Sequence, residues 1–152
     1  MIFEQQMDLL KKESKPEWSR PSFPDVTGIK QVAVDLETYD PDIKTLGGGW
    51  ATNKGFVVGV AISFEGFDGY FPVRHERGGN FSESEVKKWL TKLFKQDPIV
   101  ICHNAVYDLG WLRRWGVECD VTKVYDTLIA APLVDENRFS YSLDSVSYTH
   151  LT

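Results

Sequence analysis

Several stretches of the chain alternate hydrophobic with polar residues, the pattern that predicts half-buried β-strands. Residues 29–37, IKQVAVDLE, show it first and are rich in β-branched side chains. Two more strand candidates, 56–66 and 69–75, follow each other so closely that they predict an antiparallel hairpin. The run PIVIC at 98–102 is continuously apolar, which is typical of a strand buried on both faces.

A period near 3.6 residues predicts three helices among these strands. The first begins after Ser82, an N-cap residue type with Glu85 three positions later, and its apolar stripe consists of Val86, Trp89, Leu90 and Leu93. The second lies within 103–116 and ends at a glycine. A brief strand then precedes a third helix that starts near Asp126, which could cap it. This order predicts an α/β fold, a mixed β-sheet flanked by helices.

Residues 1–28 differ from the rest of the chain. Three prolines lie within nine positions of the stretch KPEWSRPSFPDVTG and disfavour both helix and strand. We therefore expect an N-terminal arm along the surface of the domain, with Trp18 and Phe23 as its anchors. The domain proper is expected over 29–146.

Composition narrows the function classes. With 152 residues and 42% hydrophobic side chains, the chain has the size and composition of one globular domain. Its two cysteines have no metal-ligand spacing and cannot form a disulfide framework. No apolar run approaches the roughly 20 residues that span a bilayer, so we expect a cytoplasmic protein without a membrane partner. The formal net charge of −5 argues against a protein that binds nucleic acid through bulk positive charge. It permits a local site in which bound cations supply the positive charge.

Two groups of polar residues stand where a ligand site would lie. Asp35 and Glu37 are spaced i and i+2, so both point to one face near the carboxyl end of the first strand. In open α/β sheets, ligands bind at that edge. Asn104 and Asp108 are spaced i and i+4, on one face of the second helix. If the strand at 98–102 lies beside the first strand, Asp108 can approach Asp35 and Glu37.

Three carboxylates in a partly buried place would repel one another unless a cation joined them. Oxygen-only ligands suit Mg²⁺ or Mn²⁺, and a pair of such ions about 4 Å apart is suited to displacement at a phosphate. Taken alone, each motif is more typical of solvated acids or of helix caps than of a ligand site.

The motifs taken together and in order resemble the 3′-5′ exonuclease (proofreading) domain of family A DNA polymerases. VAVDLET resembles its first motif and HNAVYDLGWL its second; YDTLIAAPLV, YSLDSV and the hairpin stretch GYFPVRHE resemble other parts of it. EWSRPSFPDVTG followed by a glycine-rich loop is similar to phage and phage-like members. The resemblance covers about 29–145 and implies the ribonuclease H-like fold of the DEDD exonuclease superfamily.

The resemblance also implies roles for individual residues. Asp35, Glu37 and Asp108 would be the catalytic ligands of two Mg²⁺ or Mn²⁺ ions. Four more residues would lie near the 3′-terminal nucleotides: Thr38, His103, Asn104 and Tyr107. The parent protein would hydrolyse the last phosphodiester of a single-stranded DNA 3′ end and release nucleoside 5′-monophosphates. A polymerase domain would follow in the chain, in the cytoplasm of a bacterial or phage-infected cell.

Structural interpretations of the same residues stay open. Tyr107 could pack on Trp111 at i+4, and His103 could bond the nearby backbone. His75 is interpreted as a structural or surface residue. Asp126 is interpreted first as a helix cap and only second as a member of the site. A flexible turn is a better interpretation of Gly47–Gly49 than a phosphate loop, since no Lys-Ser/Thr follows.

The sequence departs from the family pattern at its end. The family's third motif places a Tyr or His four residues before a final metal-binding Asp, and neither Tyr141 nor Tyr148 is followed by such an Asp. The ending SVSYTHLT resembles artefactual read-through tails. We therefore expect a domain truncated before its third motif, a non-native tail at 147–152, and little or no activity from this chain alone.

Two rival functions follow from these observations. The first, on the same fold, is a free-standing RNA exonuclease that resembles ribonuclease D or oligoribonuclease. The second is a catalytically dead domain that only binds nucleic acid or docks on a partner. The three carboxylates favour an active site over a dead one.

Overall fold

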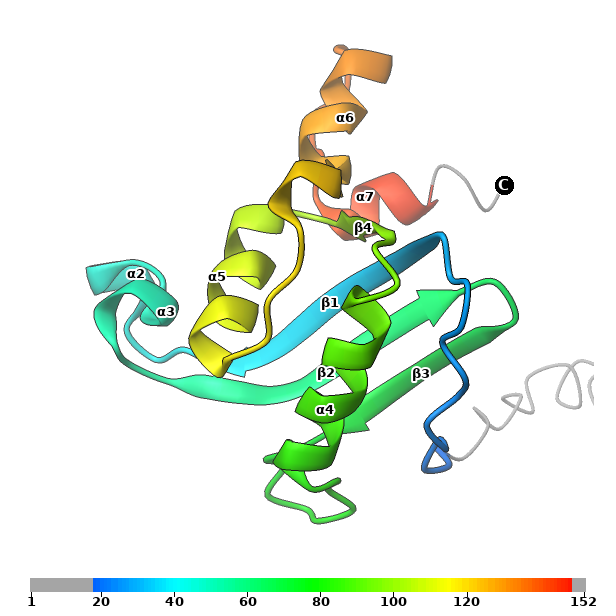
Figure 1. Ribbon diagram of the computed structural model, residues 1–152. Helices are drawn as coiled ribbons and strands as arrows, with labels where there is room; N and C mark the ends of the chain where they lie inside the picture. The colour runs from blue at the N-terminus through cyan, green and yellow to red at the C-terminus, as the bar shows by residue number, and fades with distance from the viewer. Residues whose placement is uncertain (1–17, 149–152) are drawn as a thin grey trace, which may run out of the picture.

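A five-stranded mixed sheet forms the centre of the computed structural model, which describes residues 18–148 (Figure 1). The strands are β1 (Gln31–Tyr39), β2 (Phe56–Phe64), β3 (Phe67–Pro72), β4 (Ile99–Cys102) and β5 (Val124–Asp126). Their order is β3-β2-β1-β4-β5; β1, β4 and β5 run parallel, and β2 is antiparallel to both of its neighbours. This topology confirms the α/β fold, the mixed sheet flanked by helices and the hairpin expected from the sequence.

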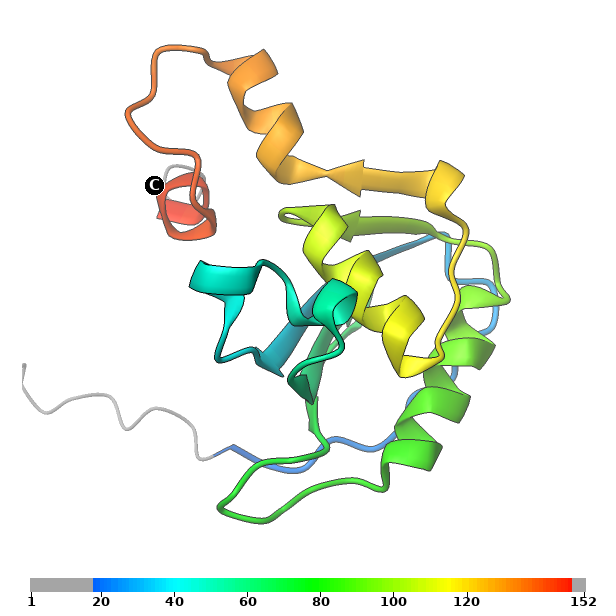
Figure 2. The same ribbon diagram turned by 90° about the vertical axis from the view of Figure 1, so that its left-hand side faces the viewer.

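The three predicted helices are confirmed as α4 (Glu83–Phe94), α5 (Ala105–Trp115) and α6 (Thr127–Val134). The sequence did not predict the shorter helices α2 (Ile43–Leu46), α3 (Gly49–Thr52) and α7 (Leu143–Tyr148), or the 3₁₀ turn at Val121–Lys123. Figure 2 shows α3 beside α5. The contact needs Gly110, because a Cβ there would lie 2.4 Å from the Trp50 ring.

The core lies between one face of the sheet and the helices α4 and α5. Val34 and Leu36 of β1 stand opposite Ile62 and Val60 of β2, and all four side chains are buried. The predicted stripe of α4 is buried along its whole length. Because these alternate β1 residues are buried, the register of β1 in the sheet is fixed. The residues between them therefore point to the opposite face of the sheet.

The described part of the predicted arm, residues 18–28, contains no helix or strand. Phe23 anchors it by stacking on Phe71 with ring centroids 5.2 Å apart, and the Trp89 indole N–H donates to the Pro24 carbonyl at 3.0 Å. Trp18 is 53% exposed and is not such an anchor. Residues 1–17 and 149–152, with most of the predicted arm and tail, lie outside the described residues. Within 18–148, no helix is long and apolar enough to span a membrane.

Candidate metal and nucleic-acid site

Asp35 and Glu37 lie on the face of β1 that the helices leave uncovered, and both are exposed, whereas Leu36 between them is buried. The i, i+2 prediction that they share a face is therefore confirmed. Small residues stand opposite them on β2, since Asp35 pairs with Ala61 and Glu37 with Gly59. The short Ala61 side chain leaves open space beside Asp35, whereas the Tyr70 side chain occupies the space at Gly59.

Asp108 reaches the same strand from the first turn of α5. β4 pairs with β1 only as far as Ala33 opposite Ile101, so the edge of β1 beyond that point is not covered by β4. There the Leu36 N–H donates to Asp108 Oδ1 at 3.0 Å. The buried carboxylate thus lies against the backbone between Asp35 and Glu37, as expected if β4 is the neighbour of β1.

Burial dominates the electrostatics of Asp108, whose side chain is only 2% exposed. It raises the pKa of the Asp108 carboxyl to about 7; the negative charge of Asp35 adds to the increase, while the hydrogen bond from Leu36 opposes it. The two carboxylates are therefore close enough to interact. A cation near both would relieve the repulsion and favour ionised Asp108.

Among the described residues, no group of three His, Cys, Asp or Glu side chains is close enough to hold a metal ion. Asp35 and Glu37 lie on one strand, and Asp108 contacts the backbone of that strand between them. Their chemistry nevertheless fits a hard divalent cation, because all the donors are carboxylate oxygens. The metal assignment of these three residues is a proposal.

Thr38 and Tyr107, both predicted to lie near the 3′-terminal nucleotides, contact each other. Their hydroxyl oxygens lie 2.6 Å apart, and the Tyr107 hydroxyl donates to Asp40 Oδ2 at 3.3 Å. The Tyr107 ring also meets Trp111 edge-on at 6.3 Å, so the packing interpretation holds as well. Asp40, which the sequence analysis did not single out, additionally accepts the Gly49 N–H at 2.8 Å.

His103 and Asn104 form the turn between β4 and α5. His103 Nδ1 lies 2.9 Å from the Thr127 hydroxyl oxygen, a side-chain partner rather than the backbone partner considered above. Asn104 is exposed and has a left-handed backbone with φ of 70°. Asp126 is a helix cap as predicted, because its carboxylate accepts the Leu128 N–H at 2.9 Å.

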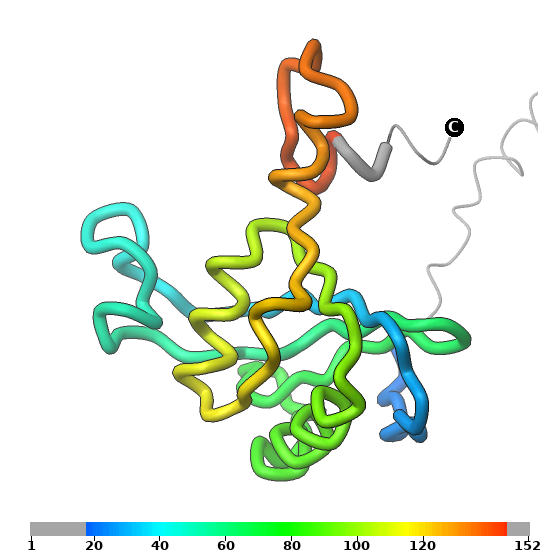
Figure 3. The backbone as a smooth tube through the Cα atoms, turned by 45° about the horizontal axis from the view of Figure 1, so that its top comes forward, coloured from blue at the N-terminus to red at the C-terminus, as the bar shows by residue number. Residues whose placement is uncertain are grey.

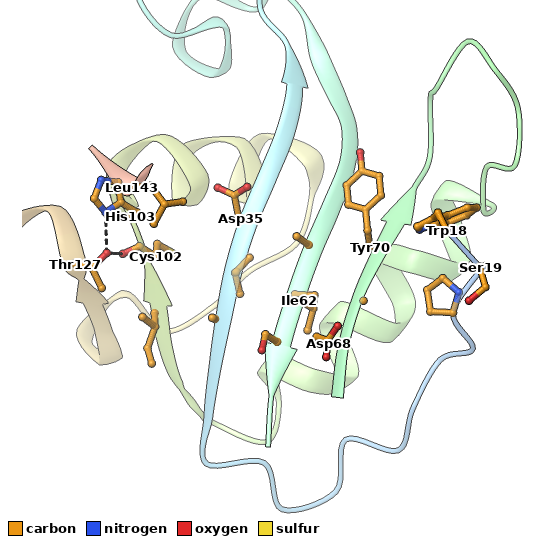
Figure 4. Close-up of a pocket in the computed structure, with 17 residues that line it drawn as sticks. Trp18, Ser19, Asp35, Ile62, Asp68, Tyr70, Cys102, His103, Thr127 and Leu143 are labelled. Carbon is orange, nitrogen blue, oxygen red and sulfur yellow. Dashed lines mark hydrogen bonds between the residues drawn. The ribbon is translucent and has the colours of Figure 1, made fainter. Parts of the chain in front are cut away.

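A hollow of about 810 Å³ lies over the uncovered face of the sheet. Figure 4 shows Asp35 on β1 between His103 on one side and Tyr70 of β3 on the other. Trp18 and Leu143 also line the hollow. It therefore joins the first carboxylate to the turn that follows β4.

Tyr70 and His75 flank the site but were not predicted to belong to it. The Tyr70 hydroxyl lies 2.6 Å from His75 Nε2, and with Glu37 both line a smaller hollow. The pKa of the Tyr70 hydroxyl is raised to about 12, mainly by burial and further by the negative charges of Glu37 and Asp35. The hydroxyl fits because residue 59 is glycine, where a Cβ would lie 2.1 Å from it. Only the β2–β3 register places Tyr70 in one row with Ala61 and Asp35.

The chain's homologues are DNA polymerases. It is 35% identical over 140 residues to the DNA-directed DNA polymerase of Pseudomonas phage M6, a match that covers 86% of this chain and 21% of the phage protein. It is 28% identical over 123 residues to DNA polymerase I of Borreliella burgdorferi, covering 80% of this chain and 12% of that protein. The chain thus spans about a fifth or less of these relatives.

Two other comparisons add less. No family model matches the chain. Its backbone is similar to the catalytic core of RRP6 from Trypanosoma brucei at a TM-score of 0.46 and 21% identity, over 69% of this chain and 25% of that one.

Proposed function

We propose that this chain, whose homologues are DNA polymerases, is the 3′-5′ exonuclease part of such a polymerase and trims single-stranded DNA at its 3′ end. The observation that carries the proposal is the contact of Asp108 with the Leu36 N–H. It joins two carboxylate motifs, distant in sequence, at the edge of the sheet where ligands of α/β proteins bind.

In this proposal Asp35, Glu37 and Asp108 hold two Mg²⁺ or Mn²⁺ ions. When bound, the ions would supply an activated water and charge stabilisation for phosphodiester hydrolysis, releasing a nucleoside 5′-monophosphate. The protein's own part is to keep three oxygen ligands at one strand edge, one of them shielded from water. The Thr38–Tyr107 hydroxyl pair, fixed by Asp40, borders the place where the last nucleotide would lie.

We propose further that the chain alone is a weak nuclease. In the family that the chain resembles, the third motif supplies a fourth carboxylate and a Tyr or His four residues before it. The sequence contains no Tyr or His with an Asp four residues later after YSLDSV. Binding of DNA through the cations is therefore expected to be easier to detect than trimming. A polymerase domain in the parent protein belongs to the same proposal.

The test measures binding and trimming of a fluorescent single-stranded oligonucleotide. With a formal net charge of −5, the chain has no bulk positive charge to attract phosphates, so we expect anisotropy to show binding in Mn²⁺ that EDTA abolishes. We expect slow release of 5′-mononucleotides from the 3′ end, lost in Asp35→Ala and in Asp108→Ala. DNA binding unchanged by chelation would overturn the proposal, and faster trimming of an RNA oligonucleotide would reassign the substrate.

A further inference from the structure

Asn104, the residue that precedes α5, does not cap its own helix. An Asn in this place ordinarily accepts the N–H of the second or third helical residue. Here its backbone is left-handed, with φ of 70° and ψ of 57°, and its side chain makes no capping hydrogen bond. Because the side chain is also exposed, its amide is available to a partner outside the helix.

Asp126 caps α5 in its place. Asp126 Oδ1 accepts the Asn104 N–H at 3.0 Å, and Oδ2 accepts the Ala105 N–H at 2.8 Å. The same carboxylate accepts the Leu128 N–H at the start of α6. It can reach both helices because Asp126 ends β5 directly opposite Cys102 of β4. One carboxylate thus fixes the turn after β4 and the start of α6.

This arrangement decides which part of a nucleotide can approach the turn. Burial alone would raise the pKa of Asp126, but the backbone N–H groups hold it below its usual value, so the group is ionised at neutral pH. A free helix N-terminus attracts phosphate through its N–H groups. At α5 two of these groups already hold a carboxylate, which disfavours a phosphate here and leaves the sugar or the base as the expected partner of the Asn104 amide.

Thr127 fixes the neighbouring imidazole in the same way. Its hydroxyl donates to the Cys102 carbonyl at 3.2 Å, so its oxygen accepts a hydrogen bond from His103 Nδ1 at 2.9 Å (Figure 4). A neutral His103 with a proton on Nδ1 has an acceptor at Nε2. His103 lines the large hollow, where a sugar hydroxyl could donate to that nitrogen.

We propose that Asp126 and Thr127 are positioning residues that hold Asn104 and His103 for the sugar or base of the 3′-terminal nucleotide. The inference rests on the proposed exonuclease function. Asp126 acts through Asn104, and Thr127 acts through His103; neither touches the cations.

The experiment is a double-mutant cycle on the full chain, with single-stranded DNA affinity in Mn²⁺ as one readout and Mn²⁺ affinity by electron paramagnetic resonance as the other. The variants are Asp126→Asn, Asn104→Ala and their combination. Asp120→Asn is the matched control, because Asp120 likewise accepts a backbone N–H two residues later, from Thr122 at 2.9 Å, but touches neither α5 nor α6.

Both single variants are expected to weaken DNA binding about tenfold, the effect of one lost hydrogen bond, and the double variant no further. Mn²⁺ should still bind to all three variants, because none of them removes a proposed metal ligand, although the charge of Asp126 acts on Asp108. The salt dependence of DNA binding should stay unchanged, because no phosphate contact is removed. Asp120→Asn should bind DNA like the wild type. Should Asp126→Asn not fold, Asp126→Glu, which keeps the charge but displaces the oxygens, serves in the same cycle with the same expectation.

Losses that multiply in the double variant would show that Asp126 does not act through Asn104 and would overturn the inference. So would unchanged DNA affinity in Asp126→Asn, or loss of Mn²⁺ from it. A wild-type chain that binds Mn²⁺ but no DNA would instead overturn the proposed function, and this inference with it. The two failures are therefore distinguishable by the wild-type measurement.

Discussion

Asp108 is the one buried charged residue in the part of the chain that the structure describes, and its ionisation opposes folding when no cation is bound. Its pKa is about 7 in the folded protein against an ordinary value of 3.8. The folded state therefore binds the proton more tightly than the unfolded state. The contribution of the Asp108 carboxyl to the free energy of unfolding is fully present below about pH 4. It falls as the pH rises from about 4 to about 7.

Asp108→Asn should remove that dependence in metal-free buffer. The amide keeps an oxygen to accept the Leu36 N–H but carries no charge, so the variant should unfold with a higher free energy than the wild type above pH 7. The shift corresponds to a difference on the order of 4 kcal/mol, and urea denaturation in EDTA at pH 4 and pH 8 measures it.

Asp68→Asn is the control for this prediction, because Asp68 is an exposed acid on β3 that lines the same hollow. It should show the pH dependence of the wild type. Equal stabilities of the wild type and Asp108→Asn at pH 8 would contradict the prediction, because they would mean that burial does not destabilise the ionised Asp108.

Single residues were predictable where the spacing within one element decides their direction. The two-residue period placed Asp35 and Glu37 on one face, and the i, i+4 spacing suggested where Asp108 would lie. Asp40 and Tyr70 were missed because their roles depend on contacts between elements. Tyr70 lies beside the site because of the register between β3 and β2, and because residue 59 is a glycine with no side chain in its way.

At the scale of elements, the Glu83 side chain links the first turn of α4 to the segment after β3 and to α5. Its carboxylate accepts hydrogen bonds from Arg74 after β3, from Lys87 one turn on, and from the Trp115 indole of α5. Burial would raise its pKa, but these partners lower the pKa of Glu83 to about 2. The resulting stability is present above about pH 4.5 and is lost as the pH falls toward 2.

We therefore expect Glu83→Gln to lower the free energy of unfolding at pH 7 by about 1–3 kcal/mol, the range for lost hydrogen bonds to a charged group. Glu85→Gln, on the same turn but exposed, should be nearly neutral. Thermal denaturation of both variants at pH 7 checks this, and equal melting temperatures would contradict it.

The helix α6 projects away from the sheet, as Figures 1 and 3 show, and contributes little to the core. Its Leu133 is 84% exposed, whereas Leu112 of α5 is fully buried. Leu112→Ala should lower the free energy of unfolding by about 2–5 kcal/mol, and Leu133→Ala by less than about 0.5 kcal/mol. Chemical denaturation measures both; a comparable loss in Leu133→Ala would show that α6 is covered in solution.

Long elements were predictable because their periods are maintained over many residues. The stripe of α4 and the alternation of β1 extend over several turns or pairs and fix both type and face. The short helices α2 and α3 were missed because four residues carry no period. They depend instead on tertiary contacts, such as Asp40 accepting the Gly49 N–H.

At the scale of the molecule, the parallel strands β1, β4 and β5 bring three distant segments to one edge of the sheet. Asp35 lies in the middle of β1, two residues beyond the last residue that pairs with β4; the sequence had placed it near the strand's carboxyl end, but β1 continues to Tyr39. The His103–Asn104 turn follows β4, and Asp126 ends β5. The order of elements predicted this mixed sheet, but sequence reasoning could only make the adjacency of β4 and β1 a condition. The depth at which Asp108 is buried also required the fold, because it depends on where β4 stops pairing.

The most direct test of the site is a Mn²⁺ titration by electron paramagnetic resonance on the wild-type chain and on Asp35→Ala and Asp108→Ala. Asp68→Ala, an acid on the same face of the sheet, is the control. We expect bound Mn²⁺ in the wild type and in Asp68→Ala, and its loss in both other variants, because residues 35 and 108 would share the ion. Mn²⁺ that remains bound to folded Asp35→Ala or Asp108→Ala, or a folded wild type that binds none, would contradict a shared metal site.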